Sequence, residues 1–164
     1  MSKGTKKLQE EFSELRKGGL SHVGGSAGPI ERNFLHWRAC FIGPKRTPYE
    51  NGLFYVEMVF DENYPETKPK VRFKTPVFHP NVYKDGSICI DYINNWNNQK
   101  IKNVRSIVDG LFELLCFPNF KDRANTDCSQ DNYQQKASEC RSQNCGASQS
   151  YDWKLDKSWK PCNY

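Results

Sequence analysis

The chain has 164 residues, of which 37% are apolar and 26% are charged. This length is typical of one domain with a substantial core and leaves little room for a second domain. The net charge of +5 is too small, and the lysines and arginines too scattered, to indicate binding to nucleic acid. No apolar run approaches the roughly 20 residues that a bilayer span needs, so we expect no membrane segment.

The N-terminus is polar and basic. Lys3, Lys6 and Lys7 are followed by Gln9 and Glu10, without the apolar stretch that marks a secretory signal. We therefore expect the protein to stay inside the cell, in the cytoplasm, the nucleus or both.

Cysteine is frequent, with 7 residues. An odd number in a chain without a secretory signal favours free thiols over a disulfide framework. Cys140, Cys145 and Cys162 could in principle hold zinc near the C-terminus. No C-x-x-C pair supports such a site, so no bound metal is expected.

The first half of the chain predicts a helix followed by a strand meander. Leu8, Phe12 and Leu15 recur at helical spacing, which predicts a helix over residues 3–17. A weak strand is predicted over 20–26, followed by strands over 33–42, 53–60 and 71–73. Turn residues separate these runs at short intervals, and this favours antiparallel pairing.

The second half predicts an irregular loop and further helices. Residues 75–99 follow neither period, and long irregular stretches inside a compact domain are often functional. An apolar stripe predicts the central core helix over 102–116, and 125–144 reads as one or two polar helices with Thr126 as candidate N-cap. This order indicates an α+β fold: N-terminal helix, four-stranded antiparallel meander, active-site loop, C-terminal helices. We assign residues 1–146 to this domain and leave the extension 147–164 unassigned.

The candidate chemical centre is the triplet His79-Pro80-Asn81, followed by Cys89 within Gly86-Ser87-Ile88-Cys89-Ile90-Asp91. A cysteine taken alone is more often a small buried hydrophobe than a nucleophile. With the surrounding motifs, however, the chain resembles the ubiquitin-conjugating enzyme family over about residues 6–144. The motifs, in order, also include Ser26-Ala27-Gly28-Pro29, His36-Trp37, Gly43-Pro44, Pro48-Tyr49, Gly52-Leu53-Phe54, Tyr64-Pro65, Lys70-Val71, Trp96, Leu114-Leu115, Pro118-Asn119 and Asp122.

The resemblance implies acyl transfer through a thioester, without a bound cofactor. Cys89 would accept ubiquitin from an activating enzyme, which uses ATP upstream, and would pass it to a substrate lysine or a ligase. The implied partners are ubiquitin or a ubiquitin-like protein, the activating enzyme, ubiquitin ligases and protein substrates. Conjugation of another ubiquitin-like protein is an alternative, although the insertion expected of the SUMO branch near Trp96 is missing. A non-catalytic scaffold is a second alternative, but such variants lack the cysteine.

The resemblance also implies roles for residues around Cys89. The family asparagine, here Asn81, either stabilises the oxyanion or holds the neighbouring loop. Asp122 matches a carboxylate that orients the attacking lysine and accepts or relays its proton. His79, Pro80 and Asp91 are assigned to the structure of the loop, and Asp91 is also a second candidate for accepting the proton.

Two further surfaces are implied by family positions. Lys6 and Lys7 match basic residues with which the first helix meets the activating enzyme. Ser26 matches a sheet-face serine to which a second ubiquitin binds non-covalently.

The chain departs from the family at its ligase surface. Glu66 replaces an apolar residue after Tyr-Pro, and Asn97-Asn98 replace Ser-Pro after Trp96. A charge in place of an apolar anchor weakens binding to an unchanged partner. Glu66, Asn97 and Asn98 are therefore candidates for altered ligase choice.

Overall fold

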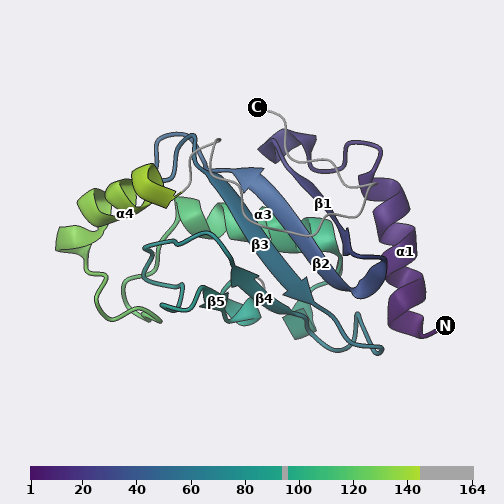
Figure 1. Cartoon of the computed structure of the whole chain (residues 1–164). Helices are drawn as coiled ribbons and strands as arrows, with labels where there is room; N and C mark the ends of the chain where they lie inside the picture. The colour runs from purple at the N-terminus through teal and green to yellow at the C-terminus, as the bar shows by residue number, and fades with distance from the viewer. Residues whose placement is uncertain (94–95, 145–164) are drawn as a thin grey trace.

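The computed structural model describes residues 1–93 and 96–144, arranged as a sheet with helices at its back and sides (Figure 1). The five strands are antiparallel and lie in the order β1-β2-β3-β4-β5. Figure 1 shows α1 along one side, α3 behind the sheet and α4 at the opposite end. The elements are α1 (Lys3–Leu15), η1 (Ser21–Val23), β1 (Ser26–Ile30), β2 (Asn33–Ile42), β3 (Leu53–Val59), β4 (Lys70–Phe73), β5 (Ser87–Ile88), α2 (Ile90–Ile93), η2 (Trp96–Asn98), α3 (Val104–Cys116) and α4 (Gln130–Asn144).

The core lies between one face of the sheet and α3. Side chains alternate along β2, so that Trp37, Ala39 and Phe41 face inward and are fully buried. On α3, Ile107 and Leu111 meet them and are also 0% exposed. The predicted α+β fold is confirmed. The inward-facing residues of β2 and the apolar stripe of α3 bury their side chains against each other.

Two details of the predicted sheet were wrong. The strand expected over 20–26 is absent. Leu20 and Val23, three positions apart, are instead both buried beside a 3-10 turn that ends at Gly24 in the left-handed region, and β1 begins at Ser26. The sheet also has a fifth strand, Ser87–Ile88, which is too short to produce an alternating pattern and forms by pairing with Val71 and Arg72.

The last helix begins later than expected. Thr126 is not its N-cap, and α4 starts at Gln130. Ser129 and Asn132 bond reciprocally at its start, since the Asn132 side chain accepts the Ser129 N–H and the Ser129 hydroxyl accepts the Asn132 N–H. The preceding turn is held by Asn125, whose side chain accepts the Asp127 N–H.

Four of the five cysteines in the described ranges are free thiols. Cys89, Cys116, Cys128 and Cys140 are free, as expected, whereas Cys40 is disulfide-bonded, so the expectation was wrong for Cys40. No group of metal-ligating side chains occurs within the described ranges. Cys145 and Cys162, which entered the zinc alternative, lie outside those ranges, as does the extension 147–164.

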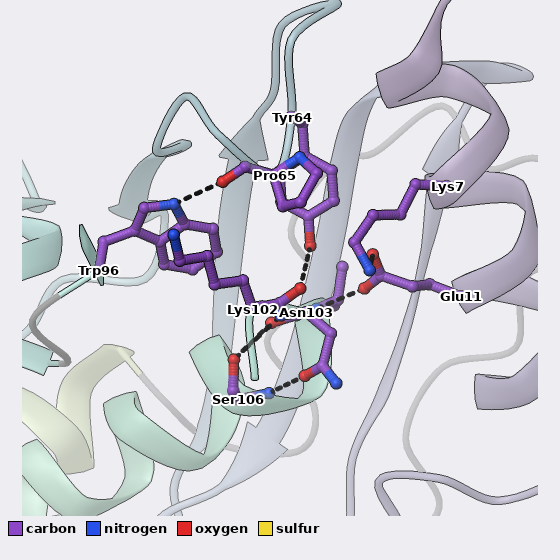
Figure 2. Close-up of polar contacts among 9 residues, drawn as sticks. Lys7, Glu11, Tyr64, Pro65, Trp96, Lys102, Asn103 and Ser106 are labelled. Atoms are coloured by element: carbon purple, nitrogen blue, oxygen red, sulfur yellow. Dashed lines mark hydrogen bonds and ion pairs between the residues drawn. The ribbon is translucent and has the colours of Figure 1, made fainter. Parts of the chain in front are cut away.

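A buried carboxylate joins α1 to α3 (Figure 2). Glu11, 8% exposed, accepts the Val104 N–H at 2.6 Å through Oε1, while its Oε2 lies 3.4 Å from Lys7 Nζ. The start of α3 also has a capping box formed by Asn103 and Ser106. Burial raises the pKa of Glu11, and the hydrogen bond from Val104 opposes this. The carboxylate thus satisfies a helix N–H that would otherwise be unpaired in the core.

We predict that Glu11→Ala lowers the free energy of unfolding by about 1–3 kcal/mol, because the Val104 N–H loses its acceptor without gaining water. Urea denaturation measures the change. Glu14→Ala is the matched control: Glu14 is exposed on the same helix, and its replacement is expected to stay within about 0.5 kcal/mol. Equal losses in the two variants would contradict the role of Glu11.

Candidate active site

Cys89 lies directly after β5 and before α2, with its side chain exposed. The turn before β5 requires Gly86, because its φ is +89° and a Cβ there would lie 2.1 Å from the Phe73 carbonyl oxygen. Among the residues described, nothing forms a hydrogen bond with the Cys89 sulfur. The thiol therefore faces solvent, where a large acyl donor can reach it.

The other free thiols of the described chain are less suited to attack. Burial raises the pKa of Cys116 and Cys140, and raises that of Cys128 to about 11. The thiolate is the nucleophilic form, so burial keeps these three cysteines in the unreactive form. Exposure thus distinguishes Cys89 as the candidate nucleophile.

His79 belongs to the core and is 0% exposed. Its Nε2 lies 2.9 Å from the Leu114 carbonyl oxygen, and its Nδ1 accepts the Asn81 N–H at 3.0 Å. These partners require the neutral ring with its proton on Nε2. Burial lowers the pKa of His79 to about 4, so the ring has a structural position and is not a base for Cys89.

Asn81 is fully buried and holds the segment that follows α3. Its Oδ1 accepts the Asn119 N–H at 2.8 Å, and its Nδ2 donates to the carbonyls of Asn119 and Asp122 at 2.9 and 2.8 Å. Both hydrogens of the amide are therefore used. In this arrangement Asn81 positions the loop, and donation to an oxyanion would require one of these bonds to open.

Pro80 adds to the same contact through its backbone. Its carbonyl accepts the N–H groups of Ala124 and Asn125 at 2.7 and 3.0 Å. The triplet His79-Pro80-Asn81 thus acts as a clamp: the side chain of Asn81 and the carbonyl of Pro80 hold the backbone of residues 119–125 against the loop that precedes β5.

Asp122 is held by its backbone, and its side chain is exposed. Its carboxylate makes no ion pair or hydrogen bond with the part of the chain that the structure describes. Asp127, by contrast, lies 2.5 Å from Lys84, which lowers the pKa of Asp127. The carboxylate of Asp122 is therefore available to an incoming group.

Asp91 has a partner that the sequence did not suggest. Lys68 Nζ lies 2.9 Å from Asp91 Oδ2, across 23 positions of sequence. Lys68 comes from the loop between β3 and β4, and no local pattern links it to Cys89. Among the candidates from the sequence, Cys89 and Asp91 are near each other because only one residue separates them in the chain. The structure itself joins Asn81 to Asp122, through the hydrogen bond from the Asn81 side chain to the Asp122 carbonyl.

Lys6, Lys7 and Ser26 lie away from the cysteine. Lys6 is exposed on α1, whereas Lys7 is half-buried beside Glu11. Ser26 begins β1, at the edge of the sheet opposite β5. With strands about 4.8 Å apart, these edges are separated by roughly 19 Å.

Glu66, Asn97 and Asn98 are brought close to one another. Trp96 is fully buried and donates from Nε1 to the Pro65 carbonyl at 2.8 Å, which places the exposed Asn97-Asn98 beside the residue after Pro65. Figure 2 shows this contact next to Lys7 and Glu11. Glu66 has a cation of its own, since Lys3 Nζ lies 2.6 Å from its carboxylate and lowers its pKa.

A family model described as ubiquitin-conjugating enzyme matches residues 7–144. The chain belongs to this family. It is 39% identical over 125 residues to ubiquitin-conjugating enzyme E2 3 of Arabidopsis thaliana, an alignment covering 76% of this chain and 81% of the relative. It is 37% identical over 125 residues to ubiquitin-conjugating enzyme E2 2 of Debaryomyces hansenii, covering 76% and 72%.

A third relative is ubiquitin-conjugating enzyme E2 1 of Caenorhabditis elegans, 38% identical over 126 residues, which cover 76% of this chain and 64% of the relative. The E2 domain of a Toxoplasma gondii ubiquitin-conjugating enzyme superimposes with a TM-score of 0.75 and 24% identity, covering 85% of this chain and 97% of that domain. The protein described here is therefore a ubiquitin-conjugating enzyme with the fold of that family. No described helix has the length and apolarity to cross a membrane.

We predict that Asn81→Ala and Asp122→Ala both slow discharge of this ubiquitin-conjugating enzyme to free lysine but differ in stability. Asn81→Ala leaves buried backbone groups unpaired, which is expected to lower the free energy of unfolding by about 2–4 kcal/mol. Asp122→Ala keeps the backbone contact and is expected to stay within about 0.5 kcal/mol. Urea denaturation and single-turnover discharge measure the two quantities. Discharge at the wild-type rate in both variants would remove both roles.

We predict that His79 makes the conjugating enzyme less stable in acid. The unfolded chain binds more protons than the folded one between the unfolded pKa near 6.5 and the folded pKa of about 4. The free energy of unfolding therefore decreases as the pH is lowered through this window, by about 2 kcal/mol from pH 7 to pH 5 for this group. NMR titration of the His79 ring, assigned by its loss in His79→Gln, measures the folded pKa. Titration of that ring near pH 6.5 would contradict the structural assignment.

Proposed function

We propose that this ubiquitin-conjugating enzyme carries ubiquitin as a thioester on Cys89 and transfers it to a substrate lysine or a ligase cysteine. The observation that supports this most directly is the exposure of Cys89, in contrast to Cys128, which is buried, and Cys116 and Cys140, which are partly buried. Asn81, in the irregular segment that leads to Cys89, also holds the backbone of Asn119 and Asp122 in place.

The first step is thioester exchange. The Cys89 thiolate attacks the carbonyl carbon of the donor thioester, a new C–S bond forms and the old one breaks, releasing the donor's thiolate. The reaction is close to isoenergetic and needs alignment more than a base. ATP enters only upstream, at the activating enzyme, and we propose no cofactor for the chain itself.

The second step is attack by an amine. Its nitrogen bonds to the thioester carbon, the C–S bond breaks, Cys89 leaves as thiolate, and the proton lost by nitrogen passes to Asp122 or to water. Asp122 suits this role because its carboxylate is exposed and unpaired among the described residues, while its backbone is held by Asn81. Asn81 acts in this scheme by positioning Asp122 and the loop around it.

The surfaces proposed to bind partner proteins are chosen by which side chains are exposed and which are already engaged in ion pairs. We propose that Lys6 contributes more than Lys7 to binding the activating enzyme, since Lys7 is engaged with Glu11. We propose that Ser26 supports non-covalent ubiquitin at the far edge of the sheet. At the ligase surface, a partner would meet a Glu66 already paired with Lys3, so it must accommodate two charges beside Asn97-Asn98.

The test is charging by an activating enzyme with ATP and ubiquitin, followed on a non-reducing gel. Wild type is expected to form a reductant-sensitive adduct, and Cys89→Ser an oxygen ester resistant to reductant or no adduct. Cys116→Ser, Cys128→Ser and Cys140→Ser are the matched controls and should charge like wild type.

Reductant-sensitive charging of Cys89→Ser would overturn the assignment. Parallel reactions with other ubiquitin-like proteins and their own activating enzymes identify the cargo. Charging by one of those proteins, and not by ubiquitin, would favour the alternative conjugation pathway. Absence of any adduct in wild type would favour a non-catalytic scaffold.

A further inference from the structure

The outer face of the sheet carries a small apolar cluster of its own. Cys40 of β2 lies on the side opposite to the core-facing Ala39 and Phe41, and it pairs in register with Tyr55 of β3. Cys40, Leu53 and Tyr55 form a cluster separate from the main core and are 0%, 4% and 8% exposed. Figure 1 has this face turned to the viewer and shows no described helix in front of it. The free face of an antiparallel sheet is usually polar and solvated, so a buried apolar cluster there indicates a covering segment.

Cys40 is also joined by a disulfide bond. The chain has 7 cysteines, and the other described ones are all free thiols: Cys89, Cys116, Cys128 and Cys140. The cysteines that remain as partners within the chain are Cys145 and Cys162, which both follow the last described residue, Asn144.

The disulfide lies at the residue assigned above to non-covalent ubiquitin. Ser26 Oγ is 3.6 Å from Cys40 Sγ, and the two residues are register partners in β1 and β2. A chain segment bonded to this sulfur therefore begins within contact distance of the Ser26 hydroxyl. Ubiquitin and such a segment cannot occupy the same surface at once.

The sequence of residues 145–164 suits an apolar surface. Its large apolar and aromatic residues are Tyr151, Trp153, Leu155, Trp159 and Tyr164. Tyrosine and tryptophan supply a wide apolar contact and keep one polar group that can remain at the rim. This composition complements the cluster of Cys40, Leu53 and Tyr55, whereas a simple flexible linker is rich in glycine and serine.

We propose that the disulfide of Cys40 is a redox switch, which fastens residues 145–164 over the outer face of the sheet and closes the Ser26 surface to ubiquitin. Reduction releases the segment and opens the surface. This inference rests on the proposed function of Ser26 and names the regulation of that site. Inside the cell, where we expect the protein to stay, disulfides are usually transient or redox-sensing, which fits a switch.

The opening step is thiol–disulfide exchange with a small thiol such as glutathione. Its thiolate attacks one sulfur of the disulfide, the S–S bond of the protein breaks, and the released cysteine thiolate takes up a proton. A second glutathione thiolate attacks the mixed disulfide, and the other protein cysteine leaves and is protonated. Two glutathione thiols are thus oxidised to one disulfide, while the protein disulfide gains two electrons and two protons.

The first experiment identifies the bond. The full chain is alkylated without reduction, digested and mapped by mass spectrometry, before and after treatment with excess glutathione. We expect a cross-linked peptide pair that joins Cys40 to Cys145 or to Cys162 and that glutathione removes. Absence of both pairs after mild oxidation, or a bond that excess glutathione leaves closed, would overturn the proposal.

The second experiment measures non-covalent binding. Isotope-labelled ubiquitin is titrated with the full chain and followed by NMR, without activating enzyme or ATP, so that no thioester forms. The variants are Cys40→Ala and the double variant Cys145→Ser/Cys162→Ser, which removes both candidate partners and leaves the sheet intact. Cys116→Ser is the matched control, because Cys116 is a free thiol at the end of α3.

We expect the oxidised wild type to bind ubiquitin at least about tenfold more weakly than the reduced form, because a tethered segment competes at an effective concentration in the millimolar range. Cys40→Ala and the double variant should bind equally under both conditions, with the affinity of the reduced wild type. Cys116→Ser should respond to oxidation as wild type does.

Equal affinity of oxidised and reduced wild type would overturn the proposal, and so would a redox response that persists in the double variant. Lack of ubiquitin binding in every form would be a different result: it would overturn the proposed function of Ser26, and this inference with it. Thioester formation on Cys89 is measured separately and would stand in either case.

Discussion

The buried amide of Asn81 is the interaction on which the site depends. One side chain accepts one backbone hydrogen bond and donates two others, all to residues 119–122. A buried polar group that loses such partners gains none from water, so the contact is either complete or strongly unfavourable. It therefore fixes the distance between the loop before Cys89 and the segment that bears Asp122.

The clamp is in turn fastened to the core through His79. The ring of His79 connects the Asn81 N–H to the Leu114 carbonyl of α3, and it can do so only as the neutral ring with its proton on Nε2. The central helix thus holds the active-site loop by a polar contact as well as by packing. The irregular segment that precedes β5 and Cys89 is therefore fixed at His79 and Asn81.

The loop between β3 and β4 distributes charge over two surfaces. Glu66 pairs with Lys3 of α1, and Lys68 pairs with Asp91 of α2, although only one residue separates them in the loop. Trp96 holds this loop by its bond to the Pro65 carbonyl. The candidate ligase surface and the start of α2, next to Cys89 in sequence, therefore share a support, and a change in the path of this loop would alter both.

The sequence by itself determined the long periodic elements and indicated Cys89 as the candidate nucleophile. The apolar and aromatic residues of β2 and the apolar stripe of α3 predicted the positions of these elements closely, because burial requires such residues in a run or at a fixed spacing. The order of motifs around Cys89 indicated the family. The tertiary structure alone decided the short elements, since Ser87–Ile88 is a strand only where β4 lies beside it. It also decided which carboxylates are paired. Lys68 and Asp91 meet because of the path of the β3–β4 loop, and a contact of that kind leaves no periodic signal in the sequence.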